Sequence, residues 1–229
     1  MKVAISQSNY IPWKGYFDMI GKSDVFVLYD DMQYTKRDWR NRNKIKTPNG
    51  LIWLTIPVNV KGNYYQKISE TRISEPGWAK KHLRSIELNY KKAACFDSVF
   101  PIIESWYNEV ENFEFLSEVS HFFLENVCNQ FGIQTQLVNS SKYDIKGSKT
   151  DALISVLEQI GNVDTYISGP AAKDYMEMDE FAKRNIEVEW MNYGAYPAYR
   201  QLHNGFEHRV SIIDLVLNSG FNRDLILQK

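Results

Sequence analysis

The sequence predicts an α/β fold with a mostly parallel sheet flanked by helices and with a helical middle region. Three observations lead to this prediction. Short apolar runs rich in β-branched and aromatic residues alternate with segments of helical period in the first and last thirds of the chain. The opening places a strand, a loop, a helix and a second strand within about 30 residues, the length of a parallel unit. The middle third has helical periodicity throughout.

The first part of the chain begins with two apolar runs. Both runs lack a polar face, which is typical of parallel strands covered on both sides. They are separated by a loop that contains a proline and by a short helix within 16–23, for which Gly21 is the expected stop. The strands expected in this part are 3–6, 24–30, 51–60 after a turn at 47–50, and an edge or hairpin strand at 66–74.

The middle and last parts differ in character. Between 76 and 132 apolar residues recur at helical spacing, and Gly132 is expected to end the last helix there. Beyond it, strands are expected at 133–141, 165–169 and 186–193, and helices at 151–161, 172–185 and 211–220. Ser211 and Gly220 suit the two ends of the closing helix. We expect a single α/β domain over 1–229, with 76–132 as a helical insertion or subdomain.

Composition narrows the class of protein. Hydrophobic residues make up 44% and charged residues 24% of 229 residues, which indicates a globular chain. The net charge of -1 argues against a nucleic-acid partner. No apolar run approaches the roughly 20 residues of a membrane span, and the N-terminal run is too short for a signal peptide. The two cysteines form no C-x-x-C motif, and no H-x-x-x-H motif occurs, so neither a redox site nor a zinc site is predicted. A cytoplasmic location is expected.

One stretch departs from this neutral average. Six Lys or Arg occur among the eleven residues from Lys36 to Lys46, directly after the apolar run at 24–30. Arginine presents a planar fork that matches phosphate or carboxylate, so the stretch is either an anion site or a solvated surface loop. Asp30 and Asp31 at its start could hold Mg²⁺ or pair with a nearby arginine, and both interpretations stay open.

The carboxyl ends of the strands are where open α/β sheets bind ligands. Amides, aromatics and cations follow four of the expected strands, where they could stack on rings and hold anions. The alternative is that these loops are merely tied down by their own side chains. Candidate substrate-binding residues are Gln7, Asn9, Tyr10, Trp13, Tyr16, Asp31, Gln33, Tyr34, Lys36, Arg37, Trp39, Arg40, Asn41, Arg42, Asn43, Ser168, Gly169, Tyr175, Tyr199 and Gln201.

Catalytic candidates follow from residue type alone. His82 and His203 could act as general bases, and Lys173 and Asp174 follow the strand expected at 165–169. Each could equally be an ordinary structural residue. The absence of a G-x-S-x-G elbow disfavours an α/β-hydrolase.

The chain resembles the WbqC-like proteins. The resemblance rests on QSNYIPWKGY, on YDDMQYTKRDWRNRNKIK, on WLTIPV, on YISGPAAKDY, and on YPAYRQLHNGF followed by SIIDLVLNSG, and it covers residues 2 to 222. Family members usually begin with Q-P-N-Y, where this chain has Ser8 in place of the proline. Their genes typically accompany those for bacterial O-antigen and other surface polysaccharides.

The resemblance implies a role in making an activated sugar. The preferred hypothesis is transfer of an acyl or aminoacyl group, glycine for example, to the amine of a nucleotide-linked amino sugar. An amino acid or acyl donor would be the second substrate, the cofactor is unknown (ATP with Mg²⁺ or an acyl-CoA donor), and a homodimer is possible. A nucleotide-sugar binding or scaffold protein is the first alternative.

A second alternative comes from a fold-level analogy. The opening is similar to that of nucleotidylyltransferase-like ligases, and KGSKTD at 146–151 lies where such enzymes carry a Lys-Ser loop. An ATP-dependent amide-forming ligase would fit, although the H-x-G-H signature is absent. A glycosyltransferase lacks support because Asp30-Asp31 is not a D-x-D motif.

Overall fold

A five-stranded, all-parallel sheet forms the centre of the protein, in a computed structural model that describes residues 1–194 and 196–228. The α/β prediction is therefore confirmed. The strand order is β5-β2-β1-β6-β7. The strands are β1 (Lys2–Ser6), β2 (Val25–Leu28), β5 (Gln136–Asn139), β6 (Thr165–Ser168) and β7 (Glu187–Trp190).

The direction in which strands are added reverses at the middle of the sheet. From β1 the chain adds β2 and then β5 on one side, and it later returns to add β6 and β7 on the other side of β1. Loops on the two sides of such a reversal diverge, which leaves a crevice between β1 and β6 at their carboxyl ends. The described strands thus meet the condition for a ligand site at this edge.

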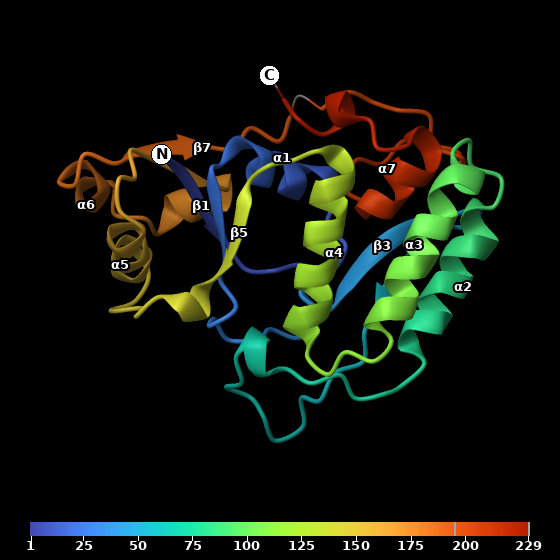
Figure 1. Cartoon of the computed structure of the whole chain (residues 1–229), viewed down its shortest axis with the longest axis horizontal. Coiled ribbons are helices and arrows are strands. Elements are labelled where there is room, and N and C mark those ends of the chain that lie inside the picture. The colour runs from blue at the N-terminus through green and yellow to red at the C-terminus, as the bar shows by residue number, and fades with distance from the viewer. Residues whose placement is uncertain (195, 229) are drawn as a thin grey trace.

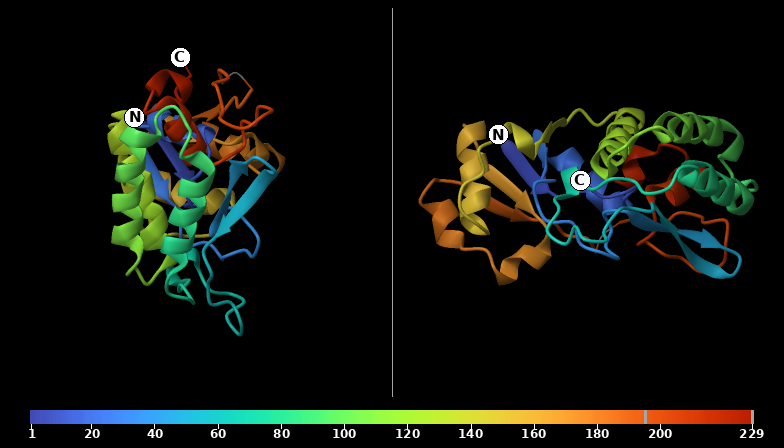
Figure 2. Two further views of the ribbon diagram at one scale, coloured as in Figure 1. Left: turned by 90° about the vertical axis from the view of Figure 1, so that its right-hand side faces the viewer. Right: turned by 90° about the horizontal axis from the view of Figure 1, so that it is seen from below.

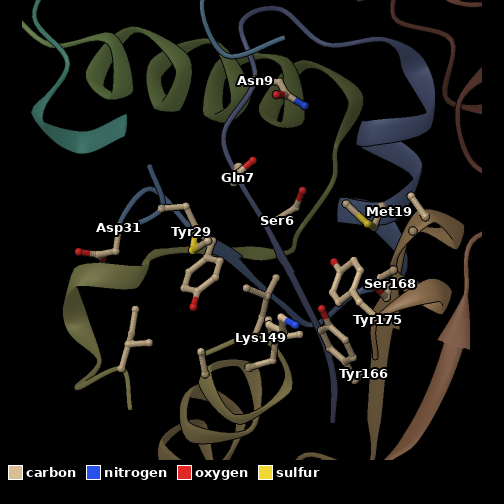
Figure 3. Close-up of a pocket in the computed structure, with 18 of the residues that line it drawn as sticks. Ser6, Gln7, Asn9, Met19, Tyr29, Asp31, Lys149, Tyr166, Ser168 and Tyr175 are labelled. Carbon is tan, nitrogen blue, oxygen red and sulfur yellow. The ribbon is translucent and has the colours of Figure 1, made fainter. Parts of the chain in front are cut away.

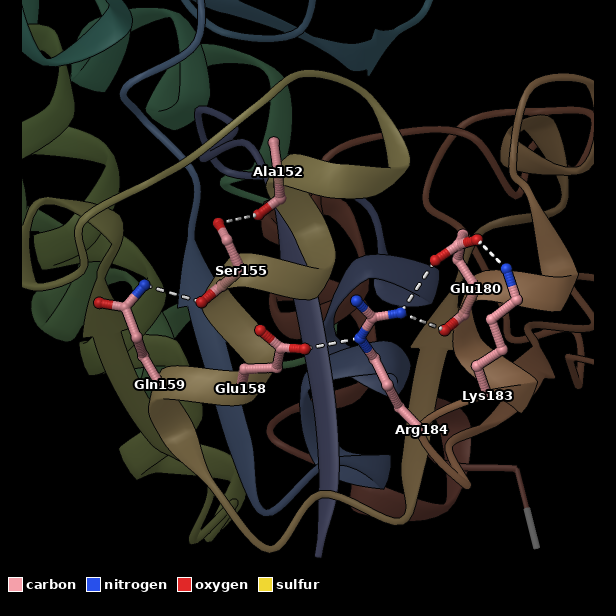
Figure 4. A network of polar contacts seen from close by, with 7 residues as sticks. All are labelled: Ala152, Ser155, Glu158, Gln159, Glu180, Lys183 and Arg184. Atoms are coloured by element: carbon pink, nitrogen blue, oxygen red, sulfur yellow. Dashed lines mark hydrogen bonds and ion pairs between the residues drawn. The ribbon is translucent and has the colours of Figure 1, made fainter.

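Helices cover both faces of the sheet (Figure 1). Alternation along the strands explains the two layers: Ala4 and Phe26 join the larger hydrophobic core with α1 and α4, whereas Val3 and Val25 join a smaller core with α5 and α6. These helices are α1 (Lys14–Lys22), α4 (Leu116–Phe131), α5 (Thr150–Ile160) and α6 (Met178–Ala182). Arg184 links α5 to α6 at the surface, with Nε donating to Glu158 at 2.6 Å (Figure 4).

A long insertion separates β2 from β5. It contains an antiparallel hairpin, a 3₁₀ helix at Ile68–Glu70 and then a helical layer, and α7 from the end of the chain packs against it (Figure 2). Ser211 caps α7 by accepting from the Ile213 amide at 3.2 Å, as the sequence predicts, and Gly220 ends it. The elements are β3 (Arg42–Thr47), β4 (Gly50–Thr55), α2 (Trp78–Tyr90), α3 (Phe96–Val110) and α7 (Ile212–Ser219).

Several elements differ from the sequence-based expectations. The expected strand at 51–60 stops at Thr55, two residues before Pro57, and pairs with β3 instead of the parallel sheet. The expected strand at 66–74 is interrupted by the 3₁₀ helix, and its flanking residues Lys67, Arg72 and Ile73 form only isolated β-bridges, each to a different segment. The expected helix at 172–185 contains a 3₁₀ helix and only the short α6. Gly21 lies inside α1, which Lys22 ends.

Candidate functional site

A large pocket lies at the carboxyl edge of the sheet, around the point where the strand order reverses (Figure 3). Its volume is about 1280 Å³, more than most small-ligand sites need. Loops after β1, β2, β5 and β6, together with Tyr193 beyond β7, contribute to its lining. A ligand larger than a single small metabolite therefore fits here.

The lining of the pocket combines apolar and polar side chains. Ile5 of β1, Met19 of α1 and Leu153 of α5 are apolar members of it. After Ser6 the chain leaves the sheet, and the polar side chains of Gln7 and Asn9 line the pocket. Such a lining buries the body of a ligand and orients it through a few polar contacts.

The loop after β1 is held in place by the insertion. The Tyr10 amide donates to Trp39 O at 3.1 Å, and Asn43 Nδ2 donates to Tyr10 O and Ile11 O at 3.1 and 3.0 Å. Asn41 Nδ2 in turn donates to Ile56 O at 2.8 Å. Asn41, Asn43 and Tyr10 are buried, so these three predicted binding residues lie behind the pocket wall and support it.

Arg40 and Lys149 bring positive charge to the lining. Arg40 donates to Asn9 Oδ1, and its Nη2 lies 3.6 Å from Asp38 Oδ2, while its Nε is buried without a partner. Lys149 lies at the start of α5 and has a positive φ of 51°. No hydrogen bond or ion pair of Lys149 Nζ is found among the described residues. The two cations can therefore meet an anionic ligand.

Asp30 and Asp31 point in different directions. Asp30 is buried and accepts from the Ser8 amide at 2.9 Å, and its other oxygen lies 2.7 Å from His121 Nε2. It ties the β1 loop to α4, with one protein donor on each carboxylate oxygen. Asp31 lines the pocket and pairs with Lys67 at 2.9 Å. Partial burial alone would raise the pKa of Asp31, but the hydrogen bonds from Lys67 and Ser140 outweigh it and lower that pKa.

Aromatic side chains form the remaining walls. Trp13 and Tyr193 meet edge to face with ring centroids 5.2 Å apart, so the loops after β1 and β7 close on each other. The Tyr16 hydroxyl donates to Gln7 O at 2.8 Å and supports the same loop. Rings that line the pocket can stack on a base or a sugar. They are Trp13, Tyr16, Tyr29, Trp39, Tyr143, Tyr166, Tyr175 and Tyr193.

His82 lies in the hydrophobic core, away from this pocket lining. Its Nε2 is 3.1 Å from Thr55 O, which can only accept, so Nε2 carries the proton and Nδ1 accepts from the Tyr10 hydroxyl at 2.9 Å. The Tyr107 hydroxyl lies 2.5 Å from that of Tyr10 and completes the chain. Burial lowers the pKa of His82 to about 4. These contacts describe a neutral structural histidine.

The remaining catalytic candidates also lie outside the pocket lining. Lys173 rests over the Trp190 ring at 5.3 Å, and Asp174 follows it on the same 3₁₀ helix. His203 Nε2 lies 2.9 Å from Asn89 O, beside α2. None of the three faces the space where a ligand would sit.

A separate buried network includes two predicted binding residues. The Tyr199 hydroxyl donates to Asp214 Oδ1 at 2.7 Å, and Gln201 accepts from Lys46 Nζ at 2.8 Å and donates to the Tyr199 hydroxyl at 3.0 Å. The Tyr90 hydroxyl donates to the other oxygen of Asp214. The network joins the C-terminal loop to β3 and α7, so Tyr199 and Gln201 have a structural role in it.

Of the predicted binding residues, ten line the pocket and the others do not. Gln33, Lys36 and Arg37 are exposed beside it, Tyr34 is buried, and Arg42 stacks on Trp53 in the hairpin. The ten in the lining are Gln7, Asn9, Trp13, Tyr16, Asp31, Trp39, Arg40, Ser168, Gly169 and Tyr175.

Sequence reasoning missed several lining residues. Lys67 comes from a segment predicted to be a strand, and nothing in its sequence links it to Asp31. The sequence contains a signal that could have predicted Lys149. KGSKTD follows the fifth expected strand, and the rule that places ligands at the carboxyl ends of strands applies there too. Tyr29 lies in the strand predicted at 24–30, where an aromatic ring is expected to be part of the hydrophobic core.

Together the fold and the pocket define a doubly wound α/β protein with a large pocket at the reversal of strand order. The chain belongs to the WbqC-like protein family, whose model matches residues 7–224. It is 48% identical over 219 residues to the uncharacterised protein Rv1507c of Mycobacterium tuberculosis, covering 96% of this chain and 94% of that protein. No solved structure matches.

No helix within 1–194 and 196–228 combines the length and apolar character that crossing a membrane requires. Over the same ranges, no three His, Cys, Asp or Glu side chains come together in a group suited to a metal ion.

Proposed function

We propose that the pocket binds a nucleotide-linked amino sugar and that the protein transfers an acyl or aminoacyl group to the sugar amine. The observation that carries this proposal is the combination of pocket volume, aromatic walls and the cations Arg40 and Lys149 at the reversal of strand order, beside a third, Lys67, that pairs with Asp31. A nucleotide-linked sugar needs a wall for its base, donors for its pyrophosphate and polar groups for its sugar. Surface-polysaccharide biosynthesis in the cytoplasm is the setting that the family suggests.

Charge supports placing the pyrophosphate near Arg40 and Lys149. Charge-assisted hydrogen bonds to phosphate are the strongest that side chains make, and Arg40 Nε is buried without a protein partner. The N-terminus of α5 begins beside Lys149, where its dipole favours negative charge. The rings of Trp13 and Tyr193 offer a wall for the base.

The chemical step would be attack of the amine nitrogen on an activated carbonyl carbon. The N–C bond forms, and the bond from the carbonyl carbon to the leaving group breaks with its electron pair passing to the leaving group, which takes up the proton that the nitrogen loses. Asp31 is ionised at neutral pH, and the hydrogen bonds from Lys67 and Ser140 lower its pKa further, so it can accept a hydrogen bond from the amine and orient it. The amino acid or acyl donor is the second substrate, and neither a nucleic-acid partner nor a homodimer is needed for this step.

An ATP-dependent amide-forming ligase is the second candidate function. The placement of Gly147, Ser148 and Lys149 in the pocket lining favours it, because a Lys-Ser loop at a helix N-terminus can hold a triphosphate. A binding or scaffold protein without turnover would use the same pocket. Turnover assays separate these functions.

Binding is tested first, by calorimetry with dTDP- and UDP-linked amino sugars. We expect Arg40→Gln and Lys149→Gln each to weaken affinity roughly 10- to 100-fold, the worth of a hydrogen bond to a charged group. Lys36→Gln is the matched control, because Lys36 is exposed and outside the pocket lining. Unchanged affinity in both pocket variants would contradict the proposed site.

Turnover is tested by mass spectrometry after incubation with nucleotide-linked amino sugars, amino acids, ATP and acyl-CoA. An acylated sugar formed without ATP supports the transferase, and a product that requires ATP supports the ligase. No new mass with any combination would favour a binding protein.

A further inference from the structure

We propose that the exposed face of the β3–β4 hairpin is a second nucleotide-binding subsite, which holds the nucleotide portion of the acyl donor beside the pocket. This inference rests on the proposed function, because it assigns a place to the second substrate. Four side chains, here called the tryptophan–cation cluster, make up the subsite: Trp39, Arg42, Lys44 and Trp53.

The cluster is assembled by the hairpin register. Lys44 lies directly opposite Trp53 across the antiparallel pair, and Arg42 lies two residues before Lys44 on the same face. The guanidinium carbon of Arg42 is 4.0 Å from the centroid of the Trp53 ring, and Lys44 Nζ is 4.8 Å from it. Trp39, from the preceding loop, places its ring centroid 5.4 Å from that of Trp53. Two indole rings and two cations therefore share one small surface.

This surface faces solvent. Trp39 is 39% exposed and Trp53 is 41% exposed, whereas Ile45 and Leu54 on the opposite face of the hairpin are buried. The hairpin lies at the outside of the molecule (Figure 2). Single exposed apolar residues need no explanation, but two adjacent tryptophans with cations over them are a characteristic of binding surfaces.

The charges indicate an anionic occupant. Neither Arg42 nor Lys44 has a carboxylate within ion-pair distance among residues 1–194 and 196–228, although Asp38 nearby pairs with Arg40. Indole rings recognise a flat ligand by stacking, and the cations recognise phosphate. A ligand that satisfies both is a nucleotide, with a base on the tryptophans and a phosphate at Arg42 and Lys44. A neutral sugar would stack on the rings but leave both cations unused.

The position of the cluster links it to the pocket. Trp39 and Arg40 both line the pocket, while Trp53, Arg42 and Lys44 lie outside the lining. Trp39 therefore borders both spaces. A donor whose nucleotide rests on Trp53 would extend its acyl group past Trp39 toward a sugar amine in the pocket. Group transfer requires both substrates to be bound at once in adjoining sites, and this arrangement provides them.

The test measures the binding of ATP and of coenzyme A, each added alone, by calorimetry and by quenching of tryptophan fluorescence. We expect Trp53→Leu to weaken binding of at least one of them about tenfold to a hundredfold, the range found when a base loses its stacking partner. Trp53→Phe should restore most of the affinity. Leu51→Ala is the matched control, because Leu51 is 40% exposed on the same strand and has no ring.

The outcomes separate this inference from the proposed function. Affinity for the nucleotide-linked sugar should stay the same in Trp53→Leu, since Trp53 does not line the pocket. Unchanged binding of both probes in Trp53→Leu would overturn the second subsite while leaving the pocket proposal standing. Competition between a probe and the nucleotide-linked sugar would also overturn it. A single-stranded oligonucleotide that binds more tightly as its length increases would point to nucleic acid and contradict a small donor.

Discussion

Replacing His82 with glutamine tests whether this residue is structural. In the folded protein its pKa is lowered to about 4 by burial, against an ordinary value near 6.5. At pH values between about 4 and 6.5, the unfolded chain binds a proton at His82 that the folded protein does not bind. The unfolding free energy that depends on a neutral His82 is therefore fully present above pH 6.5 and is lost as the pH falls to 4.

The size of the effect follows from the shift. A difference of about 2.5 pKa units corresponds to about 3 kcal/mol at 1.36 kcal/mol per unit. The variant His82→Gln cannot be protonated, but it leaves the Tyr10 hydroxyl without its acceptor, at a cost of about 1–3 kcal/mol. We expect the variant to be less stable than the wild type at pH 7. Because the wild type alone loses about 3 kcal/mol by pH 4, the difference should vanish or change sign there.

Urea unfolding at pH 7, 6, 5 and 4, followed by circular dichroism, measures this difference. Tyr107→Phe is the control, since it removes a hydroxyl from the same chain of hydrogen bonds but leaves His82 able to titrate. Its stability should run parallel to that of the wild type. A constant gap between wild type and His82→Gln at all four pH values would refute the reasoning.

Three further predictions concern the surroundings of the pocket. Lys14 is 2% exposed, and burial lowers its pKa to about 8. Between pH 8 and 10.5 only the unfolded chain keeps this side chain protonated, so the unfolding free energy of the wild type should rise by up to about 3 kcal/mol relative to that of Lys14→Met. Urea unfolding at alkaline pH measures this difference. Asp30→Ala should lower thermal stability by about 2–3 kcal/mol, because the Ser8 amide loses its buried acceptor, and a melting temperature equal to that of the wild type would contradict this role. Gly15→Ala would place a methyl 2.3 Å from the Trp13 ring, so the ring must move. Calorimetry should then find weaker nucleotide-sugar binding with little loss of stability. Unchanged affinity would show that the Trp13 ring does not contact the ligand.

The fold followed from local patterns. Apolar runs such as 3–6 and 24–30 are buried on both faces, which only a covered parallel sheet provides, and the chain order of strands and helices then limits the topology. The hairpin was harder to predict, because β3 carries five polar or charged residues among its six and buries Asn43 against the loop after β1 and Lys46 against the C-terminal loop. Composition alone makes such a segment look like a solvated loop.

The sequence by itself determined the α/β class, the family and the edge of the sheet at which the pocket lies. Those conclusions depend on period and chain order, which are local properties. Only the tertiary structure decided that Arg40 lines the pocket while Arg42 stacks on Trp53, that His82 is a core residue, and that Lys67 meets Asp31. Side-chain directions in irregular loops follow from contacts between distant segments, and no periodicity in the chain encodes them.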